Sequence, residues 1–137
     1  MGRDAVRVTA DTNVLIRALT GDDVRQSEIA KAELAGASLI ALPLGALCEA
    51  VWVLSRGYRI APAQIAQTLR RLINSANVAV NRPAAEAGLA LLEAGGDFAD
   101  GVIAYEGRWL GGEDFISFDR KAVELLQAQG EAARLLG

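Results

Sequence analysis

Short apolar runs alternate along the chain with longer segments in which apolar residues recur every three or four positions. The short runs predict strands at 6–10, 38–42, 77–80, 114–118 and 132–136. The longer segments predict helices at 12–19, 22–35, 44–54, 61–74, 83–94, 97–110 and 119–129. This alternation predicts an α/β fold over residues 1–137 as a single domain, with a mainly parallel sheet of four to five strands flanked by helices.

The helix predicted at 44–54 carries a single polar residue, Glu49, in an otherwise apolar sequence. A helix that is apolar on nearly every side is typical of a buried helix. Burying an ionised glutamate without a partner costs several kcal/mol or more, at order of magnitude. Glu49 is therefore expected to meet a cation or to open into a cleft.

Composition excludes several classes of protein. Hydrophobic residues make up 52% of the 137 residues and charged residues 23%, which favours a globular domain over a disordered chain. No apolar run reaches the roughly 18 residues needed to span a bilayer, and no secretory leader is visible. The single cysteine, Cys48, excludes an internal disulfide. We therefore expect a cytoplasmic protein without membrane contact.

The absence of histidine narrows the chemistry further. It excludes histidine-ligated zinc, the Ser-His-Asp triad and imidazole acid–base catalysis. The net charge of −3 argues against a broad basic face for nucleic acid. All but two of the 14 basic residues are arginine, which suits local recognition of phosphates. What remains for hydrolysis is a set of carboxylates with a hard metal ion, or an unusual nucleophile.

Acidic residues recur where the predicted strands end and the following helices begin. Asp11 and Asp119 each follow a strand, so a parallel sheet would place them at the same edge. Asp97 and Asp100 open another helix that would join them if it starts at that edge. Several carboxylates in one pocket would repel unless a cation lay among them, and oxygen ligands favour Mg²⁺ or Mn²⁺. This arrangement predicts metal-assisted hydrolysis of a phosphodiester.

A structural interpretation competes with this one at each acid taken singly. Aspartate is among the preferred helix N-caps, so Asp11, Asp97 and Asp119 each fit a capping role. Asp100 lies three residues after Asp97, as in a capping box. Glu49, in the middle of a helix, fits no such role. Capping and metal binding are compatible, so both interpretations stay open for the aspartates.

Four motifs together resemble the PIN domain family, and in length and spacing the ribonuclease toxins of VapBC-type toxin–antitoxin pairs. They are Asp11-Thr-Asn-Val-Leu, Glu49 within Cys-Glu-Ala-Val-Trp-Val-Leu, Asp97-Phe-Ala-Asp100-Gly-Val-Ile-Ala, and Ser117-Phe-Asp119. The resemblance covers nearly the whole chain. It implies a Rossmann-like sheet, an Mg²⁺- or Mn²⁺-dependent endoribonuclease acting on RNA, a homodimer and a cognate antitoxin protein.

The resemblance also assigns individual residues. The catalytic and metal-binding acids of the family carry over to Asp11, Glu49, Asp100 and Asp119, with Asp97 as a further candidate ligand. Polar groups beside the site are expected at Thr12, Asn13 and Ser117.

Arginines near these acids are candidates for contact with RNA. Arg56 follows Glu49 and Arg120 follows Asp119. Trp52 with Arg56 and Arg59 either clamps single-stranded RNA or is a core tryptophan beside solvated arginines.

Two other functions compete with the nuclease. An aspartyl-phosphate phosphotransfer domain would place an acid two residues after its nucleophile, but Asn13 follows Asp11 there. A catalytically inactive PIN-like binding module is the other alternative, and the intact set of acids argues against it.

Overall fold

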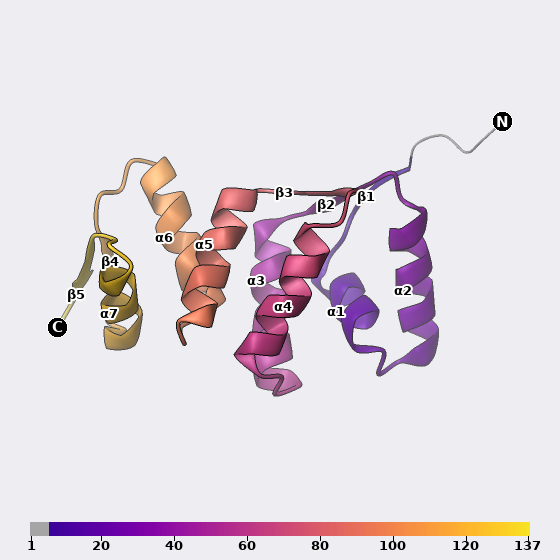
Figure 1. Ribbon diagram of the computed structural model, residues 1–137, viewed down its shortest axis with the longest axis horizontal. Coiled ribbons are helices and arrows are strands. Elements are labelled where there is room, and N and C mark those ends of the chain that lie inside the picture. Colours follow the sequence, from indigo (N-terminus) through magenta and orange to yellow (C-terminus); the bar gives the residue numbers. More distant parts are fainter. Residues whose placement is uncertain (1–5) are drawn as a thin grey trace. The chain divides into compact units, whose positions relative to one another are not determined.

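A computed structural model describes residues 6–137 of the chain (Figure 1). The chain divides into two compact units, an N-terminal unit of Met1–Asn81 and a C-terminal unit of Arg82–Gly137. Each unit contains parallel strands and buried apolar residues of its own. The single domain predicted over residues 1–137 therefore remains a prediction, and its first five residues lie outside the described residues.

The N-terminal unit begins with a strand and ends with one. Its elements are β1 (Arg7–Thr9), α1 (Thr12–Thr20), α2 (Val24–Gly36), β2 (Leu39–Leu42), α3 (Leu44–Trp52), the π-helical turn η1 (Val53–Gly57), α4 (Pro62–Ile73) and β3 (Val78–Val80). Gly21 ends α1 with a positive φ of 70°, a conformation that glycine adopts without steric cost. Pro62 begins α4, where its missing N–H group is not needed.

The three strands of this unit form a parallel sheet in the order β1-β2-β3. Val8 lies opposite Ile40, and Ile40 lies opposite Val78. Because the strands are parallel, α1 and α3 both start from the carboxyl edge of the sheet, directly after β1 and β2. Leu15 and Leu47, on those two helices, are each 1% exposed, so the helices are fixed by apolar packing.

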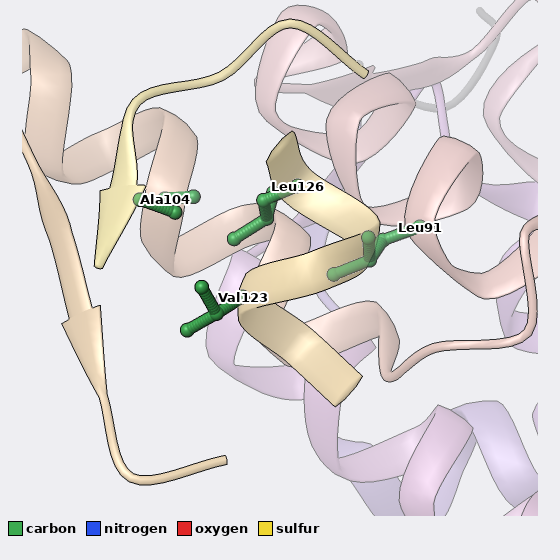
Figure 2. Packing of buried hydrophobic residues seen from close by; sticks show 5 residues of the cluster. Leu91, Ala104, Val123 and Leu126 are labelled. Carbon is green, nitrogen blue, oxygen red and sulfur yellow. The ribbon is translucent and has the colours of Figure 1, made fainter. Parts of the chain in front are cut away.

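The C-terminal unit contains α5 (Arg82–Glu93), α6 (Phe98–Trp109), β4 (Phe115–Ser117), α7 (Arg120–Ala128) and β5 (Ala133–Leu135). Strands β4 and β5 are parallel, and α7 is the crossover between them. Figure 2 shows the apolar cluster that joins these elements, in which Val123 and Leu126 of α7 pack with Leu91 of α5 and Ala104 of α6.

Helices α5 and α6 lie side by side in this unit and approach closely at two glycines (Figure 1). A Cβ atom on Gly101 would lie 2.4 Å from the carbonyl oxygen of Ala87, and one on Gly88 would lie 2.7 Å from the ring of Phe98. A side chain at Gly101 would push the two helix backbones apart, and one at Gly88 would displace the Phe98 ring. Glycine inside α6 is thus explained by the helix crossing.

The predicted order of strands and helices is confirmed, and all observed strand pairs are parallel. Within residues 6–137, however, the five strands form one sheet of three and one of two. Helix α2 begins at Val24 rather than at 22, because Asp23 caps it. The helix predicted at 44–54 is regular only to Trp52 and continues as η1.

The prediction that this helix is buried on nearly every side is wrong. Leu47, Ala50 and Val51 are buried, but Glu49 and Trp52 are exposed. The apolar side chains on α3 therefore do not all face the core.

Across residues 6–137, none of the helices combines the length and apolar composition that crossing a membrane requires.

Candidate functional site

Asp11 lies just beyond the carboxyl end of β1, at the start of α1. The strand-like pairing continues one residue past β1, since the N–H of Ala10 donates to the carbonyl of Ala41 at 3.1 Å. Asp11 then caps α1, and its Oδ1 accepts a hydrogen bond of 2.9 Å from the N–H of Val14. The capping role predicted for Asp11 is confirmed. Its side chain remains exposed, so capping leaves carboxylate oxygen available to a ligand.

Glu49 is joined to the same helix start by a side-chain contact. The hydroxyl of Thr12 donates a hydrogen bond of 2.8 Å to Oε1 of Glu49. This contact links the first turn of α1 to the middle of α3, two helices that follow neighbouring parallel strands. Glu49 is exposed, so it does not need the cation that a position inside a buried helix would have required. Thr12 instead fixes the position of one carboxylate oxygen.

Asn13 is exposed on α1 beside a shallow pocket formed with α2. The pocket is lined by Asn13, Val14, Arg17, Gln26, Ile29, Ala30 and Glu33. The amide of Asn13 therefore lies at the edge of this pocket, two residues after Asp11 in the sequence.

In the C-terminal unit, two of the predicted acids cap helices and a third lies inside one. Asp97 caps α6 by accepting a hydrogen bond of 3.2 Å from the N–H of Ala99. Asp119 caps α7 by accepting one of 3.2 Å from the N–H of Ala122. Asp100 lies in the first turn of α6 and is half-buried. The capping roles of Asp97 and Asp119 are confirmed.

Ser117 shapes the turn that carries Asp119. Its Oγ accepts a hydrogen bond of 2.9 Å from the backbone N–H of Asp119. Ser117 is the last residue of β4 and Asp119 precedes α7, so this bond fixes the strand-to-helix turn. Arg120, the first residue of α7, is exposed beside this turn. The sequence-based placement of Ser117 next to the acid is thus consistent with the contact observed.

Asp100 lies where its surroundings disfavour the ionised carboxylate. Burial raises the pKa of Asp100 above its usual value, and the negative charges of Asp97 and Asp119 raise it further. Among residues 6–137, no arginine or lysine forms an ion pair with any of these three carboxylates. Their mutual repulsion is therefore left uncompensated by the protein.

The predicted site residues fall into two groups. The structure brings Asp11, Thr12 and Glu49 together in the N-terminal unit, and Asp97, Asp100 and Asp119 together in the C-terminal unit. Within the described part of the chain, no three acidic or cysteine side chains are already arranged closely enough to hold a metal ion. Carboxylate oxygens are nevertheless the donors that Mg²⁺ and Mn²⁺ prefer, and uncompensated carboxylates fit a divalent cation.

Trp52 is the residue whose setting the sequence left open. Its side chain is 59% exposed, so the interpretation as a core tryptophan is wrong. Arg56, in η1, is exposed as well. The sequence did contain one indication of this exposure. Trp52 lies three residues after Glu49, and this spacing places both side chains on one face of α3.

Comparison with known proteins gives one match. The profile of the PIN domain family matches residues 8–125, which is most of the chain. The matched segment runs from β1 into α7 and includes all five candidate acids. No curated protein matches the chain.

Proposed function

The chain belongs to the PIN domain family, whose members are generally nucleases, and from that premise we propose that it is a metal-dependent endoribonuclease. The observation that carries the proposal is the group formed by Asp97, Asp100 and Asp119. Burial raises the pKa of Asp100, the charges of Asp97 and Asp119 raise it further, and none of the three carboxylates has a basic partner among the described residues. Such an arrangement disfavours the metal-free state and favours a bound cation.

The metal in this proposal is Mg²⁺ or Mn²⁺. Its ligands would come from Asp11, Glu49, Asp100 and Asp119, with Asp97 as a further candidate. When bound, a divalent ion of this kind activates water and stabilises charge on the phosphodiester oxygens. One or two such ions are compatible with this number of acids.

The chain's own residues orient the acids and handle the proton. Thr12 holds one oxygen of Glu49, so the other is left for the reaction. Ser117 fixes the turn before α7, which sets the direction of Asp119. Because the chain has no histidine, a carboxylate is the side chain suited to accept a proton from the attacking water. Arg56 and Arg120, both exposed, are placed to contact the phosphates of RNA.

We further propose that the protein is the toxin of a toxin–antitoxin pair, acting in the cytoplasm as a homodimer. Large apolar side chains are exposed in both units, among them Ile29 on α2 and Leu110 after α6. Exposed apolar surface of this kind fits protein partners, namely a second copy of the chain and a cognate antitoxin.

The first experiment is cleavage of labelled single-stranded and structured RNAs with Mg²⁺, with Mn²⁺ and with EDTA. We expect cutting that depends on the metal and disappears in Asp11→Asn, which keeps the size of the side chain but removes its charge. Asp23→Asn is the matched control, since Asp23 also caps a helix of the N-terminal unit and asparagine caps as well as aspartate.

Two results would contradict the proposal, and a third would show that such substitutions damage the fold. Cutting that survives in Asp11→Asn would indicate another site or a contaminating nuclease. Loss of cutting in Asp23→Asn would indicate damage to the fold rather than to the site. A folded protein that binds no Mn²⁺ at millimolar concentration would favour the inactive binding module instead.

A further inference from the structure

The exposed indole of Trp52 lies on the same face of α3 as Glu49. Trp52 is the last residue of α3 and follows Glu49 by three positions, a spacing that places two side chains side by side on a helix. Its side chain is 59% exposed. A large aromatic surface is thus presented to solvent next to an acid of the candidate site.

Two arginines follow Trp52 and have no acidic partner. Arg56, four residues later, is exposed on η1, and Arg59 is exposed in the loop that follows. Neither side chain forms an ion pair or hydrogen bond with any of residues 6–137. Both guanidinium groups are therefore free to bind an anion from outside the chain.

The loop that carries these arginines is anchored to the rest of its unit. The hydroxyl of Tyr58 donates a hydrogen bond of 2.6 Å to Oδ2 of Asp22, and the N–H of Ile60 donates one of 3.0 Å to the carbonyl of Leu54. Between them, Arg59 has a φ of 55°, the one positive φ outside glycine in the described part of the chain. The backbone that carries Arg59 is therefore fixed in advance of binding, while its side chain is exposed.

We propose that Trp52, Arg56 and Arg59 form a binding site for single-stranded RNA, in which the indole stacks on an unpaired base and the guanidinium groups contact neighbouring phosphates. The inference rests on the proposed nuclease function and names part of its substrate contact. Stacking on an aromatic ring combined with arginine contact to phosphate is the usual way in which single strands are held. Arg56 and Arg59 follow Trp52 closely in sequence and have no acidic partner among residues 6–137, and such positive charge favours a polyanion over an apolar protein surface.

The second tryptophan of the chain provides an internal contrast. Trp109, on α6, is also exposed, but its Nε1 donates a hydrogen bond of 2.8 Å to the hydroxyl of Tyr105. The neighbouring Arg108 forms an ion pair with Glu131 and lies over the Tyr105 ring. Trp109 and its neighbouring arginine therefore already have partners within their own unit, so Trp109 is the matched control for Trp52.

The test measures binding of a fluorescently labelled single-stranded RNA by anisotropy, in an Asp11→Asn background that prevents cutting. We expect Trp52→Ala to weaken binding by about 5- to 150-fold, the usual value of one stacked base. Trp52→Phe should retain most of the affinity, and Trp109→Ala should leave it unchanged. Arg56→Ala should lower the slope of log affinity against log salt by about 0.7, as expected for one lost phosphate contact.

Two outcomes would overturn the inference. One is an affinity for RNA that is the same with and without Trp52. The other is a change in oligomeric state in Trp52→Ala, measured by light scattering, because it would assign the surface to contact between copies of the chain.

The two proposals fail separately. If RNA affinity depends on Trp52 but the protein cuts no RNA, the nuclease proposal is contradicted and the proposed RNA-binding site is still supported. If the protein cuts RNA in a metal-dependent way but Trp52→Ala binds RNA with unchanged affinity, the nuclease proposal is supported and the proposed RNA-binding site is contradicted.

Discussion

The two units of the molecule differ in the surroundings of their candidate acids. In the N-terminal unit each carboxylate has a donor, since the N–H of Val14 reaches Asp11 and the hydroxyl of Thr12 reaches Glu49. In the C-terminal unit, Asp100 is half-buried beside two other carboxylates, and its pKa is raised by burial and by their charges. Asp97 and Asp119 also accept capping hydrogen bonds, as Asp11 does, so the units differ in the half-buried Asp100 and the charges around it.

The difference illustrates two ways in which a protein can prepare carboxylates for a metal ion. Hydrogen bonds orient a ligand before the ion arrives, which improves affinity by reducing the ordering that binding requires. Repulsion among carboxylates instead raises the free energy of the metal-free state, which a cation then relieves. We infer that the N-terminal acids contribute mainly orientation and the C-terminal acids mainly charge.

The largest effect is expected from disrupting the packing of α5 against α6, the helix that carries Asp100. Gly101 directly follows Asp100, and its added Cβ atom in Gly101→Ala would lie 2.4 Å from the carbonyl oxygen of Ala87. Helices α5 and α6 would have to move apart, and overpacking of this kind costs about 1 to 3 kcal/mol. Urea unfolding should show that loss in the free energy of unfolding.

Gly107→Ala is the matched control for this variant, because Gly107 lies on the same helix and a Cβ atom there meets nothing within 4 Å. Replacing a helical glycine by alanine at an open position should stabilise the protein by up to about 1 kcal/mol. Equal stability of the two variants would show that the close approach at Gly101 does not matter.

A smaller effect, confined to the N-terminal unit, is expected from Thr12→Val. Valine has nearly the shape of threonine but lacks the hydroxyl that donates to Glu49. Loss of a group that orients a metal ligand usually lowers metal affinity or activity by about 10- to 100-fold. We expect RNA cleavage and Mn²⁺ affinity, measured by calorimetry, to fall by about tenfold while the urea midpoint changes little.

Thr12→Ser is the control, since serine keeps the donor and should keep most of the activity. If Thr12→Val cuts RNA as fast as the unmodified protein, the orientation of Glu49 by Thr12 has no function. In that case the two units would differ functionally only in the electrostatic repulsion around Asp100.

Much of this arrangement could be predicted from local sequence signals. Alternating strands and helices, and caps at Asp11, Asp97 and Asp119, depend on interactions within a few residues. Helix caps can be predicted from sequence because the first N–H groups of every helix lack partners inside the helix, and aspartate is a preferred partner for them.

Other features depend on packing between helices that are distant in sequence, so local sequence patterns did not predict them. Gly101 looked like a flexible position in a helix, whereas a neighbouring helix backbone fills the space of its side chain. Glu49 and Trp52 lie in an apolar sequence, which predicted burial, but both are exposed. Which side of an apolar helix faces the core is set by tertiary contacts rather than by composition.

The smallest effect is expected in the pH dependence of stability, where one acid of each unit should act with opposite sign. Asp22, in the N-terminal unit, accepts hydrogen bonds from Tyr58 and Thr20, and these lower its pKa, as does the charge of Arg17. A lowered pKa in the folded state stabilises the protein above the usual aspartate value of about 3.9, and that stability is lost as pH falls through the folded pKa. The raised pKa of Asp100 instead destabilises the metal-free fold as pH rises above that value.

Asp22→Asn should therefore be less stable than the unmodified protein at neutral pH, and Asp100→Asn more stable, with EDTA present in both cases. The difference for Asp100→Asn should disappear as pH falls to about 3.9, because the folded pKa of Asp100 lies above that value. The difference for Asp22→Asn should begin to shrink only below about 3.9, because the folded pKa of Asp22 lies lower still. Urea midpoints measured between acidic and neutral pH would test this. Excess Mn²⁺ should reverse the order for Asp100→Asn, since the ion stabilises only a protein that retains the ligand. If Asp100→Asn lost stability in EDTA, repulsion among the C-terminal acids would be outweighed by a structural role of the Asp100 carboxylate.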